Sequence, residues 1–429
     1  MAFPGDLSNF PFFPLRFNKD AQAVDQGEEQ ALKTWLQSQG PVELIVFSHG
    51  WNNDEQDALA LYQHMFASFR SVLNQNHVPA MNGRNIAVAG VLWPSKKFAD
   101  EENIPGGAAG AVAVDPLADA FAGAEAAGDP AILARLKELT DKEELTLPEQ
   151  DEAVGLLRQL LATLPASSEE GSANVQAAAN DGGTFSNDVF VQQLVGEGTM
   201  PGSDASEGGA AGLFSNPMGD LTDAVRKGLN LFTFYAMRER AGIIGAQALN
   251  PLLARISALA NVRIHLIGHS FGARLVTAAA AASGLFHPSS MTLLQAAFSH
   301  YGFSTLYDGH SNGAFRNLLL EQRIKGPVLI THTPNDHAVG WAYPIAARLR
   351  SIIASSIDGG PNDPFGGLGR NGAQKTPQAI SKQLLASGSA GYTFPAAGGV
   401  LNLESTPFVN GHSGITNDAV AYAILSAMV

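Results

Sequence analysis

Short runs of apolar residues alternate along the chain with stretches in which apolar residues recur every three or four positions. The runs have the length and composition of buried strands and are bounded by glycine, proline or polar residues. They occupy 42–47, 86–92, 262–267, 291–297 and 327–331. After the first run, apolar residues at helical spacing predict an amphipathic helix, with Leu59, Tyr62, Phe66, Phe69 and Leu73 on its buried face. Strands that alternate with helices predict an α/β fold, a mostly parallel sheet with helices on both faces.

The stretch between the second and third runs, 98–227, differs from the rest of the chain. Alanine, glycine, serine and acidic residues dominate it, and aromatic residues are scarce. Two parts have a helical pattern, 131–139 and 152–164. Two others, 167–180 and 196–212, are of low complexity and are expected to be loops. We interpret 98–227 as a cap or lid, partly helical and partly mobile, inserted into the fold.

Removal of this insertion leaves 1–97 and 228–429, which we expect to form one α/β core. A domain usually has about 150 residues, so 429 residues allow two or three domains. One α/β fold with a large insertion also accounts for the length. The glycine-rich segment 358–372 is expected to be a surface loop.

Composition and charge exclude several classes of function. Hydrophobic residues make up 45% of the chain and charged residues 15%, which indicates a globular protein. The net charge of −14 repels phosphate backbones, so nucleic acid is not an expected partner. The absence of cysteine excludes disulfides, a thiol nucleophile and cysteine-ligated metals.

No signal-peptide pattern is present at the amino terminus, and no long apolar window reads as a membrane span. We therefore expect a cytoplasmic protein with no integral membrane segment. The sequence leaves open both the oligomeric state and export by a route that needs no signal peptide.

The clearest chemical motif is Gly-His-Ser-Phe-Gly at 268–272, which follows the strand run 262–267 and precedes a helix-forming run. A sharp strand-to-helix turn holds the central Ser270 in a strained backbone conformation, and side chains at the flanking glycine positions would collide with neighbouring elements. The turn places the serine hydroxyl at a helix amino terminus, where negative charge is favoured. The alternative is a glycine-rich turn in which Ser270 only caps a helix.

At these residues the sequence resembles the α/β-hydrolase superfamily of serine hydrolases, and the resemblance covers the chain outside the insertion and the glycine-rich segment. In that family a His-Gly pair after an earlier strand helps to form the oxyanion hole, and His49 and Gly50 stand at that place. The resemblance implies that the backbone N–H groups of Trp51 and Phe271 form the hole. The pair could instead be a polar strand end.

The family order of serine, acid and histidine selects the remaining catalytic candidates. His412 alone among the histidines after Ser270 follows every plausible acid-bearing strand, and it resembles the family's histidine loop. Asp336, after the run 327–331, stands where the family places its carboxylate. Asp308 is the second candidate, although it is more simply a solvated loop residue.

Several other residues admit two interpretations. His332 and His337 flank Asp336 and are metal-ligand types, but no metal site is expected, since lining of the substrate mouth and support of the acid loop explain them more simply. His265 is expected to be a core residue. Trp93 either lines the pocket or packs under the insertion. The aromatic helix 229–242 is expected to be mostly core.

The predicted activity is hydrolysis of carboxylic esters through an acyl-enzyme on Ser270, without a cofactor. The cap and its apolar flanking helices favour a small-molecule or lipid ester with a partly hydrophobic acyl group. The same residues serve amidases, peptidases, thioesterases and acyltransferases, which the sequence does not separate. Two further alternatives are a catalytically silent binding module of the same fold and an interaction role for the insertion.

Overall fold

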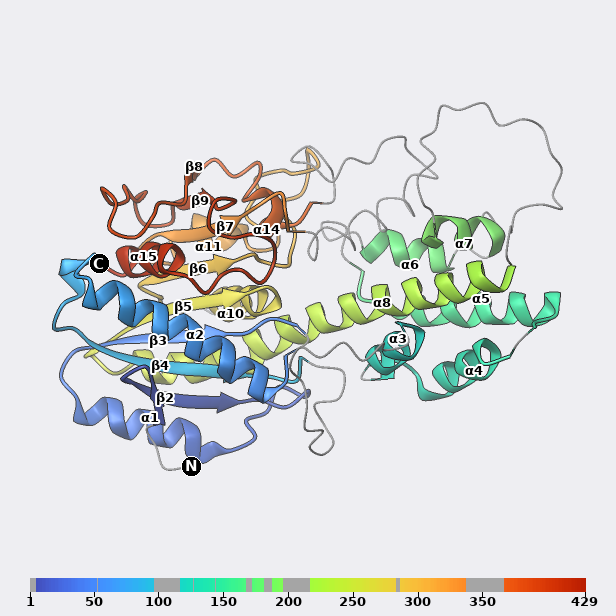
Figure 1. Cartoon of the computed structure of the whole chain (residues 1–429), viewed down its shortest axis with the longest axis horizontal. Helices are drawn as coiled ribbons and strands as arrows, with labels where there is room; N and C mark the ends of the chain where they lie inside the picture. The colour runs from blue at the N-terminus through green and yellow to red at the C-terminus, as the bar shows by residue number, and fades with distance from the viewer. Residues whose placement is uncertain are drawn as a thin grey trace. The chain divides into compact units, whose positions relative to one another are not determined.

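The computed structural model describes residues 5–51, 53–95, 116–125, 127–142, 144–166, 172–180, 187–195, 217–282, 286–336 and 366–429. Their contacts group them into two compact units (Figure 1). The first draws on Met1–Lys96, Arg238–Gly340 and Gly366–Val429, and the second on Lys97–Met237 and Trp341–Phe365.

The first unit is built on a nine-stranded sheet in the order β1-β2-β4-β3-β5-β6-β7-β9-β8. All neighbouring strands pair in parallel except β1 and β2. The strands are β1 Gly5–Leu7, β2 Phe10–Arg16, β3 Val42–Ser48, β4 Asn85–Leu92, β5 Val262–His269, β6 Ser290–Leu294, β7 Val328–His332, β8 Ala379–Gln383 and β9 Val400–Glu404. Parallel strands have their carboxyl ends at one edge, so the loops that follow them converge there.

Helices of the first unit cover both faces of this sheet. They are α1 Gln26–Ser38, α2 Glu55–Asn74, α9 Asn250–Ser257, α10 Phe271–Ala282, α11 Arg316–Leu320, α14 Leu368–Asn371 and α15 Asp418–Ala427, with a 3₁₀ turn at Pro79–Met81 and a π-helical segment Gly245–Leu249 that joins α8 (Pro217–Ile244) to α9. Helices α2 and α15 pack together on one face (Figure 1), where Ile45 and Phe47 of β3 join their cluster. Leu44 and Val46 alternate with them and are equally buried, which places them on the opposite face.

Five of the nine strands were predicted, and the exceptions have physical causes. The predicted strand 291–297 ends earlier, at Leu294, because Gln295 adopts a left-handed conformation with φ +44°. Strand β2 carries Pro11 and Pro14, which lack a backbone donor and usually argue against a strand. It nevertheless pairs with β1 and β4 near the edge of the sheet.

The second unit consists of helices in its described part: α3 Pro116–Glu125, α4 Pro130–Thr140, α5 Leu147–Ala162, α6 Ser172–Asn180, α7 Asn187–Val195 and most of α8 Pro217–Ile244. The helices expected at 131–139 and 152–164 are α4 and α5. The loop expected at 167–180 is wrong for α6, because Val175 and Ala178 are buried and Gln176 donates hydrogen bonds to the carbonyls of Ala162 and Leu164. The stretch 196–212 lies outside the described residues.

The glycine-rich segment is not a surface loop where it is described, at 366–372. Its helix α14 is packed against β7, and Leu368 is fully buried. The backbone N–H of Thr333 donates to the carbonyl of Gly369. The sequence expectation failed here because glycine content indicates flexibility, whereas these glycines permit close backbone packing. Residues 358–365 lie outside the described residues.

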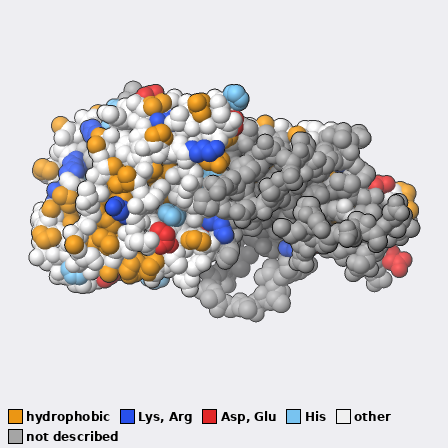
Figure 2. All heavy atoms as spheres, turned by 90° about the horizontal axis from the view of Figure 1, so that it is seen from above, with side chains coloured by type: hydrophobic (Ala, Val, Ile, Leu, Met, Phe, Trp, Pro, Cys, Tyr) orange, Lys and Arg blue, Asp and Glu red, His pale blue; other side chains and the backbone are white. Residues whose placement is uncertain are grey.

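Large exposed hydrophobic side chains of the described residues come from separate elements, and Figure 2 shows hydrophobic side chains scattered among polar ones on one face. Among the helices described, none is both long and apolar enough to cross a membrane.

Candidate active site

The sequence-predicted residues converge where the strand order reverses. From β3 the chain passes to β4 on one side and later to β5 on the other, and β3 pairs with both. Ser48 at the end of β3 is in register with Gly268 of β5. Loops on either side of such a reversal leave a crevice at the carboxyl edge, which is the usual ligand position in open α/β sheets.

Ser270 occupies a strained turn directly after β5. Its φ of +56° is rare for a residue with a side chain. A Cβ on Gly268 would lie 2.4 Å from the Cα of Ala273, and one on Gly272 would lie 2.2 Å from the carbonyl oxygen of Ser48. Both contacts are with backbone atoms, which cannot move aside. The two glycines are therefore required by the turn, for the reason expected from the motif.

Asp336 and His412 meet at the same edge from loops after β7 and β9. Nδ1 of His412 lies 3.1 Å and 3.0 Å from the two carboxylate oxygens of Asp336. Asp336 is fully buried, whereas 20% of the His412 side chain is exposed. An ionised carboxylate only accepts hydrogen bonds, so Nδ1 of His412 carries a proton, and in the neutral imidazole Nε2 is the acceptor. A general base requires this tautomer.

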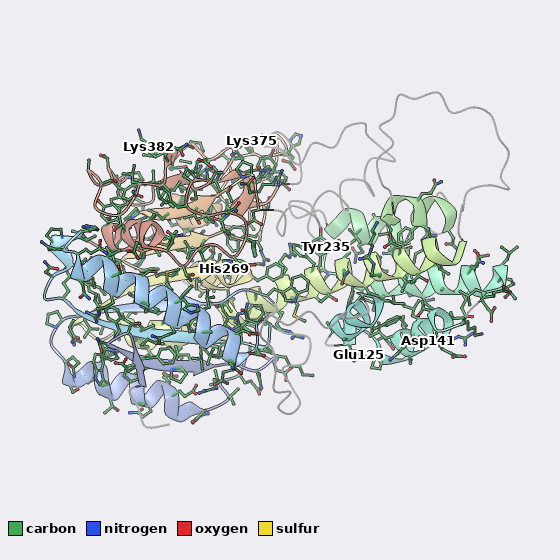
Figure 3. All side chains as sticks on the ribbon, in the orientation of Figure 1. Glu125, Asp141, Tyr235, His269, Lys375 and Lys382 are labelled. Carbon is green, nitrogen blue, oxygen red and sulfur yellow. The ribbon has the colours of Figure 1, made fainter. Side chains whose placement is uncertain are left out.

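The link between this pair and Ser270 runs through His269, the residue before the serine. His269 is labelled in Figure 3. Nε2 of His269 donates to the backbone carbonyl of His412 at 2.9 Å, and the two rings lie 4.8 Å apart. Within the described ranges, the Ser270 hydroxyl makes no hydrogen bond to the His412 ring. The structure thus joins Asp336 to His412 directly and places His412 beside the serine turn.

The loop after β3 lies against Ser270. A Cβ on Gly50 would lie 2.6 Å from the Cβ of Ser270, so only glycine allows this approach. His49 donates from Nδ1 to the carbonyl of Gly50 at 2.9 Å and accepts at Nε2 from the backbone N–H of Trp93. Burial lowers the pKa of His49 to about 4, so its ring is neutral at pH 7.

Further hydrogen bonds fix the orientation of this loop. Nδ2 of Asn53 donates to the carbonyls of Gly50 and Trp51, and the Asn53 backbone exchanges hydrogen bonds with the hydroxyl of buried Ser95. The carbonyl and N–H of one trans peptide point in opposite directions. Because His49 and Asn53 hold the Gly50 carbonyl, the Trp51 N–H of the same peptide is directed away from them.

A scan against protein-family models, a search of the curated proteins and a search of the solved structures gave no match. The interpretation of the site therefore depends on its own geometry. That geometry comprises a strained serine, a buried carboxylate with an oriented histidine, and a rigid loop against the serine, all at one sheet edge.

Two residues near Asp336 were missed by the sequence reasoning. Nε2 of Gln295 lies 3.5 Å from Asp336 Oδ2 and 3.0 Å from the carbonyl of Gly369, while its Oε1 accepts from the Thr331 hydroxyl. Nη1 of Arg370 donates to the carbonyl of Pro334 in the acid loop. A polar residue directly after the apolar run of β6 is the one sequence signal that could have drawn attention to Gln295.

The other candidates from the sequence lie elsewhere or have structural partners. Asp308 is exposed in a loop, where the N–H groups of Ser311 and His310 lower its pKa to about 2. Trp93 is buried, stacks on His49 and donates from its indole to the His49 carbonyl. Most of the apolar side chains of the helix at 229–242 are buried, as expected.

His332 ends β7 and is largely buried, which lowers its pKa. His337, the other histidine beside Asp336, lies outside the described residues. In the described part of the chain, no group of three or more potential ligands is arranged to hold a metal ion.

His265 is a buried core residue, as expected, but it belongs to an unexpected relay. Its Nδ1 lies 2.7 Å from the hydroxyl of Ser290, and its Nε2 lies 2.9 Å from Glu43 Oε2. Arg84 and Arg263 also pair with Glu43. Ser290, His265 and Glu43 are at most 7% exposed, so this relay ties the starts of β3 and β6 to the middle of β5.

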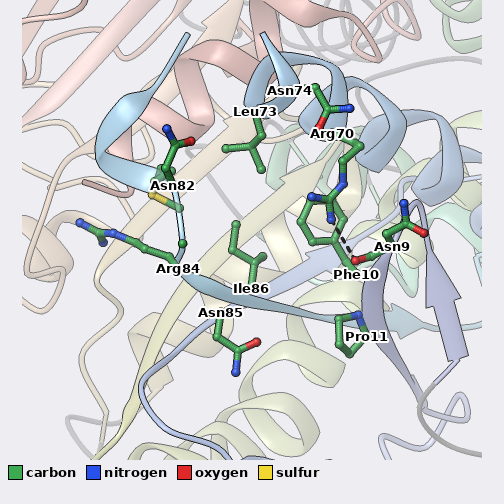
Figure 4. Close-up of a pocket in the computed structure, with 12 residues that line it drawn as sticks. Asn9, Phe10, Pro11, Arg70, Leu73, Asn74, Asn82, Arg84, Asn85 and Ile86 are labelled. Atoms are coloured by element: carbon green, nitrogen blue, oxygen red, sulfur yellow. Dashed lines mark hydrogen bonds between the residues drawn. The ribbon is translucent and has the colours of Figure 1, made fainter. Parts of the chain in front are cut away.

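A cavity of about 360 Å³ lies at the amino-terminal end of β4, among Asn9, Arg70, Asn82, Arg84 and neighbouring residues (Figure 4). Arg70 donates to the carbonyls of Ser8 and Asn9 there and covers the Phe10 ring. None of the serine, acid or histidine candidates lines this cavity.

Proposed function

We propose that the chain is a serine hydrolase of the α/β-hydrolase fold that cleaves carboxylic esters through an acyl-enzyme on Ser270. The observation that carries the proposal is the meeting, at one sheet edge, of the strained Ser270 and the buried Asp336–His412 pair. The order of these residues along the chain matches that of the superfamily. The described helices of the second unit, which come between β4 and β5 in the sequence, would belong to its cap.

In the first half-reaction, Ser270 Oγ attacks the acyl carbon while Nε2 of His412 takes its proton. The backbone N–H groups of Trp51 and Phe271 stabilise the oxyanion. Each such donor contributes about 3 kcal/mol to the transition state in serine hydrolases. His412 then gives the proton to the leaving alcohol, which leaves an ester on Ser270. Asp336 stabilises the imidazolium and keeps its tautomer.

In the second half-reaction, water attacks the acyl-enzyme. His412 takes a proton from the water and returns it to Ser270, and the carboxylic acid leaves. His412 makes each proton transfer, and Ser270 and water supply the nucleophiles. The proposed cycle therefore needs no cofactor.

The surroundings of Ser270 favour an acyl group with apolar character. Trp51 and Phe271 supply the proposed oxyanion donors from their backbones, and the centroids of their aromatic rings lie 6.0 Å apart. The net charge of −14 disfavours strongly anionic substrates. We therefore propose a small-molecule or lipid ester with an uncharged acyl chain.

The first test is labelling of the wild type and Ser270→Ala with a fluorophosphonate, read by intact mass, together with hydrolysis of p-nitrophenyl esters of increasing chain length. We expect one adduct on the wild type and none on the variant. Turnover should fall to the uncatalysed level in Ser270→Ala, and the variant should unfold at nearly the same temperature as the wild type.

Two results would contradict the proposal. Esterase activity retained by Ser270→Ala would place the chemistry elsewhere. A folded wild type that forms no adduct and hydrolyses no ester would favour the alternative of a silent binding module. Turnover of amides in place of esters would keep the mechanism and change the substrate class.

A further inference from the structure

His269 lies between the three segments that form the candidate site. It precedes Ser270, its ring lies beside the ring of His412, and a Cβ on Gly50 would lie 3.2 Å from its Nδ1. Only 6% of the residue is exposed. His269, the second residue of the Gly-His-Ser-Phe-Gly motif, therefore contacts both the loop that carries His412 and the loop after β3.

The hydrogen bond of His269 fixes its chemical state. A carbonyl only accepts, so Nε2 carries a proton where it lies 2.9 Å from the His412 carbonyl. Burial, and after it the nearby His412, lower the pKa of His269 to about 3, so the ring is neutral at pH 7. Nδ1 is then an unprotonated acceptor. His269 is thus a single, oriented donor toward His412.

His412 is consequently held at two points. Asp336 binds Nδ1 of its ring, and His269 binds its backbone carbonyl. The ends of the loop that carries His412 are anchored separately, since Val409 and Ile415 are fully buried and Nδ2 of Asn417 donates to the carbonyls of Phe408 and Gly414. A carboxylate orients the imidazole but does not fix the distance of the backbone from Ser270. The His269 hydrogen bond supplies that second restraint.

We propose that His269 is a positioning residue: it ties the backbone of His412 to the Ser270 turn and so keeps the catalytic imidazole within reach of the serine hydroxyl. This inference rests on the proposed function. We assign it no proton exchange with the substrate, since its Nε2 is engaged by the His412 carbonyl and its Nδ1 is buried beside Gly50.

The experiment compares His269→Leu, which fills similar volume without a donor, with His269→Gln, whose side-chain amide restores a donor at a similar reach. A displacement of reacting groups by about 1 Å costs about a hundredfold in rate. We expect His269→Leu to lower kcat by about 10- to 100-fold with KM nearly unchanged, and to slow fluorophosphonate labelling of Ser270 by a similar factor. His269→Gln should recover most of both rates.

His265→Gln is the matched control, because His265 is another buried, hydrogen-bonded histidine of the same strand, four residues before His269. It should lower the unfolding temperature and leave kcat within about twofold of the wild type. Thermal unfolding of each variant establishes that the rates refer to folded protein.

The outcomes separate this inference from the proposed function. A wild type that is active and labelled at Ser270, together with wild-type kcat in folded His269→Leu, would overturn the positioning role and leave the hydrolase intact. A loss in His269→Leu that His269→Gln does not recover would also overturn it, because the donor would then not be the important feature. An inactive, unlabelled wild type would overturn the proposed function itself.

Discussion

Gln295 shows how much of the candidate site depends on a residue outside any motif. Its amide nitrogen faces the carboxylate of Asp336, while its amide oxygen accepts from Thr331. The side chain reaches this position because the backbone turns to φ +44° directly after β6. Such a conformation is retained where the surroundings over-determine it, often at functional sites.

Replacement of Gln295 by Leu is expected to lower kcat about tenfold, since Asp336 loses a donor that holds its carboxylate toward His412. The variant should also lose about 1 to 3 kcal/mol of stability, because the Thr331 hydroxyl and the Gly369 carbonyl lose a buried partner. Steady-state kinetics and urea unfolding measure the two effects.

Thr331→Val is the control for this prediction. It removes the partner of the Gln295 oxygen but leaves the donor toward Asp336, so it should reduce stability with little effect on kcat. Equal effects of the two variants on kcat would show that Gln295 supports the fold and does not act through Asp336.

At the residue scale, the sequence predicted the members of the candidate site that lie in local motifs. Ser270 is recognisable because its glycines and the neighbouring strand and helix are adjacent in sequence. Gln295 is not, because its contact with Asp336 spans 41 positions and depends on a backbone angle. The role of His269 depends likewise on a carbonyl 143 positions away.

At the scale of elements, the strand-to-helix turn after β5 is the most constrained part of the first unit. Gly272 lies under the carbonyls of Ser48 and His49, at distances where a Cβ cannot fit. The same turn is joined to β6, since the Ser270 N–H donates to the carbonyl of Leu294. Substitution in this turn must therefore displace β3, β5 or the serine.

Gly272→Ala is expected to destabilise the protein by more than about 3 kcal/mol or to abolish fluorophosphonate labelling by displacing Ser270. Gly155→Ala is the matched control, because Gly155 lies within α5 with no atom within 4 Å of an added Cβ. In the control the same methyl group should stabilise the chain by up to about 1 kcal/mol. Chemical unfolding of both variants checks the contrast, and equal effects would contradict the crowding inferred at Gly272.

Elements with one continuous apolar run were predicted well, and those that depend on distant partners were not. Strands β3, β4 and β5 are buried on both faces and are apolar for most of their length. Strand β8 is exposed for most of its length and exists through pairing with β9. Helix α14 is four residues long and is stabilised by packing against β7, which its glycine-rich sequence does not indicate.

At the scale of the whole molecule, buried neutral histidines make stability depend on pH. Burial lowers the pKa of His49 to about 4 and that of His269 to about 3, and it also lowers the pKa values of His265 and His332. In the unfolded chain the pKa of histidine is about 6.5. Below that pH the unfolded chain binds protons that the native protein does not bind, so protonation favours unfolding.

Stability should therefore fall as the pH decreases from 6.5, by about 1.4 kcal/mol per pH unit for each such histidine until its native pKa is reached. Between pH 7 and pH 5, His49 and His269 should each remove about 2 kcal/mol. Urea unfolding across this range measures the slope. Between pH 8 and 9 these histidines are neutral in both states and should contribute no slope, which serves as the internal reference. An unfolding free energy that is the same at pH 5 and pH 7 would contradict the buried, neutral assignment.

The relay of Ser290, His265 and Glu43 has the same chemical composition as a hydrolase triad, with a hydroxyl, an imidazole and a carboxylate in sequence. Its serine and histidine are hydrogen-bonded, with Ser290 Oγ 2.7 Å from His265 Nδ1, whereas the Ser270 hydroxyl makes no described hydrogen bond to the His412 ring. Both serines are buried, Ser270 at 4% and Ser290 at 2% exposed, so the imidazole separates the two: 20% of the His412 side chain is exposed, but only 1% of the His265 side chain. In the fluorophosphonate experiment Ser290 should remain unmodified. Comparison of the two serines would then show that a hydroxyl, an imidazole and a carboxylate in sequence do not suffice for catalysis where substrate cannot reach them.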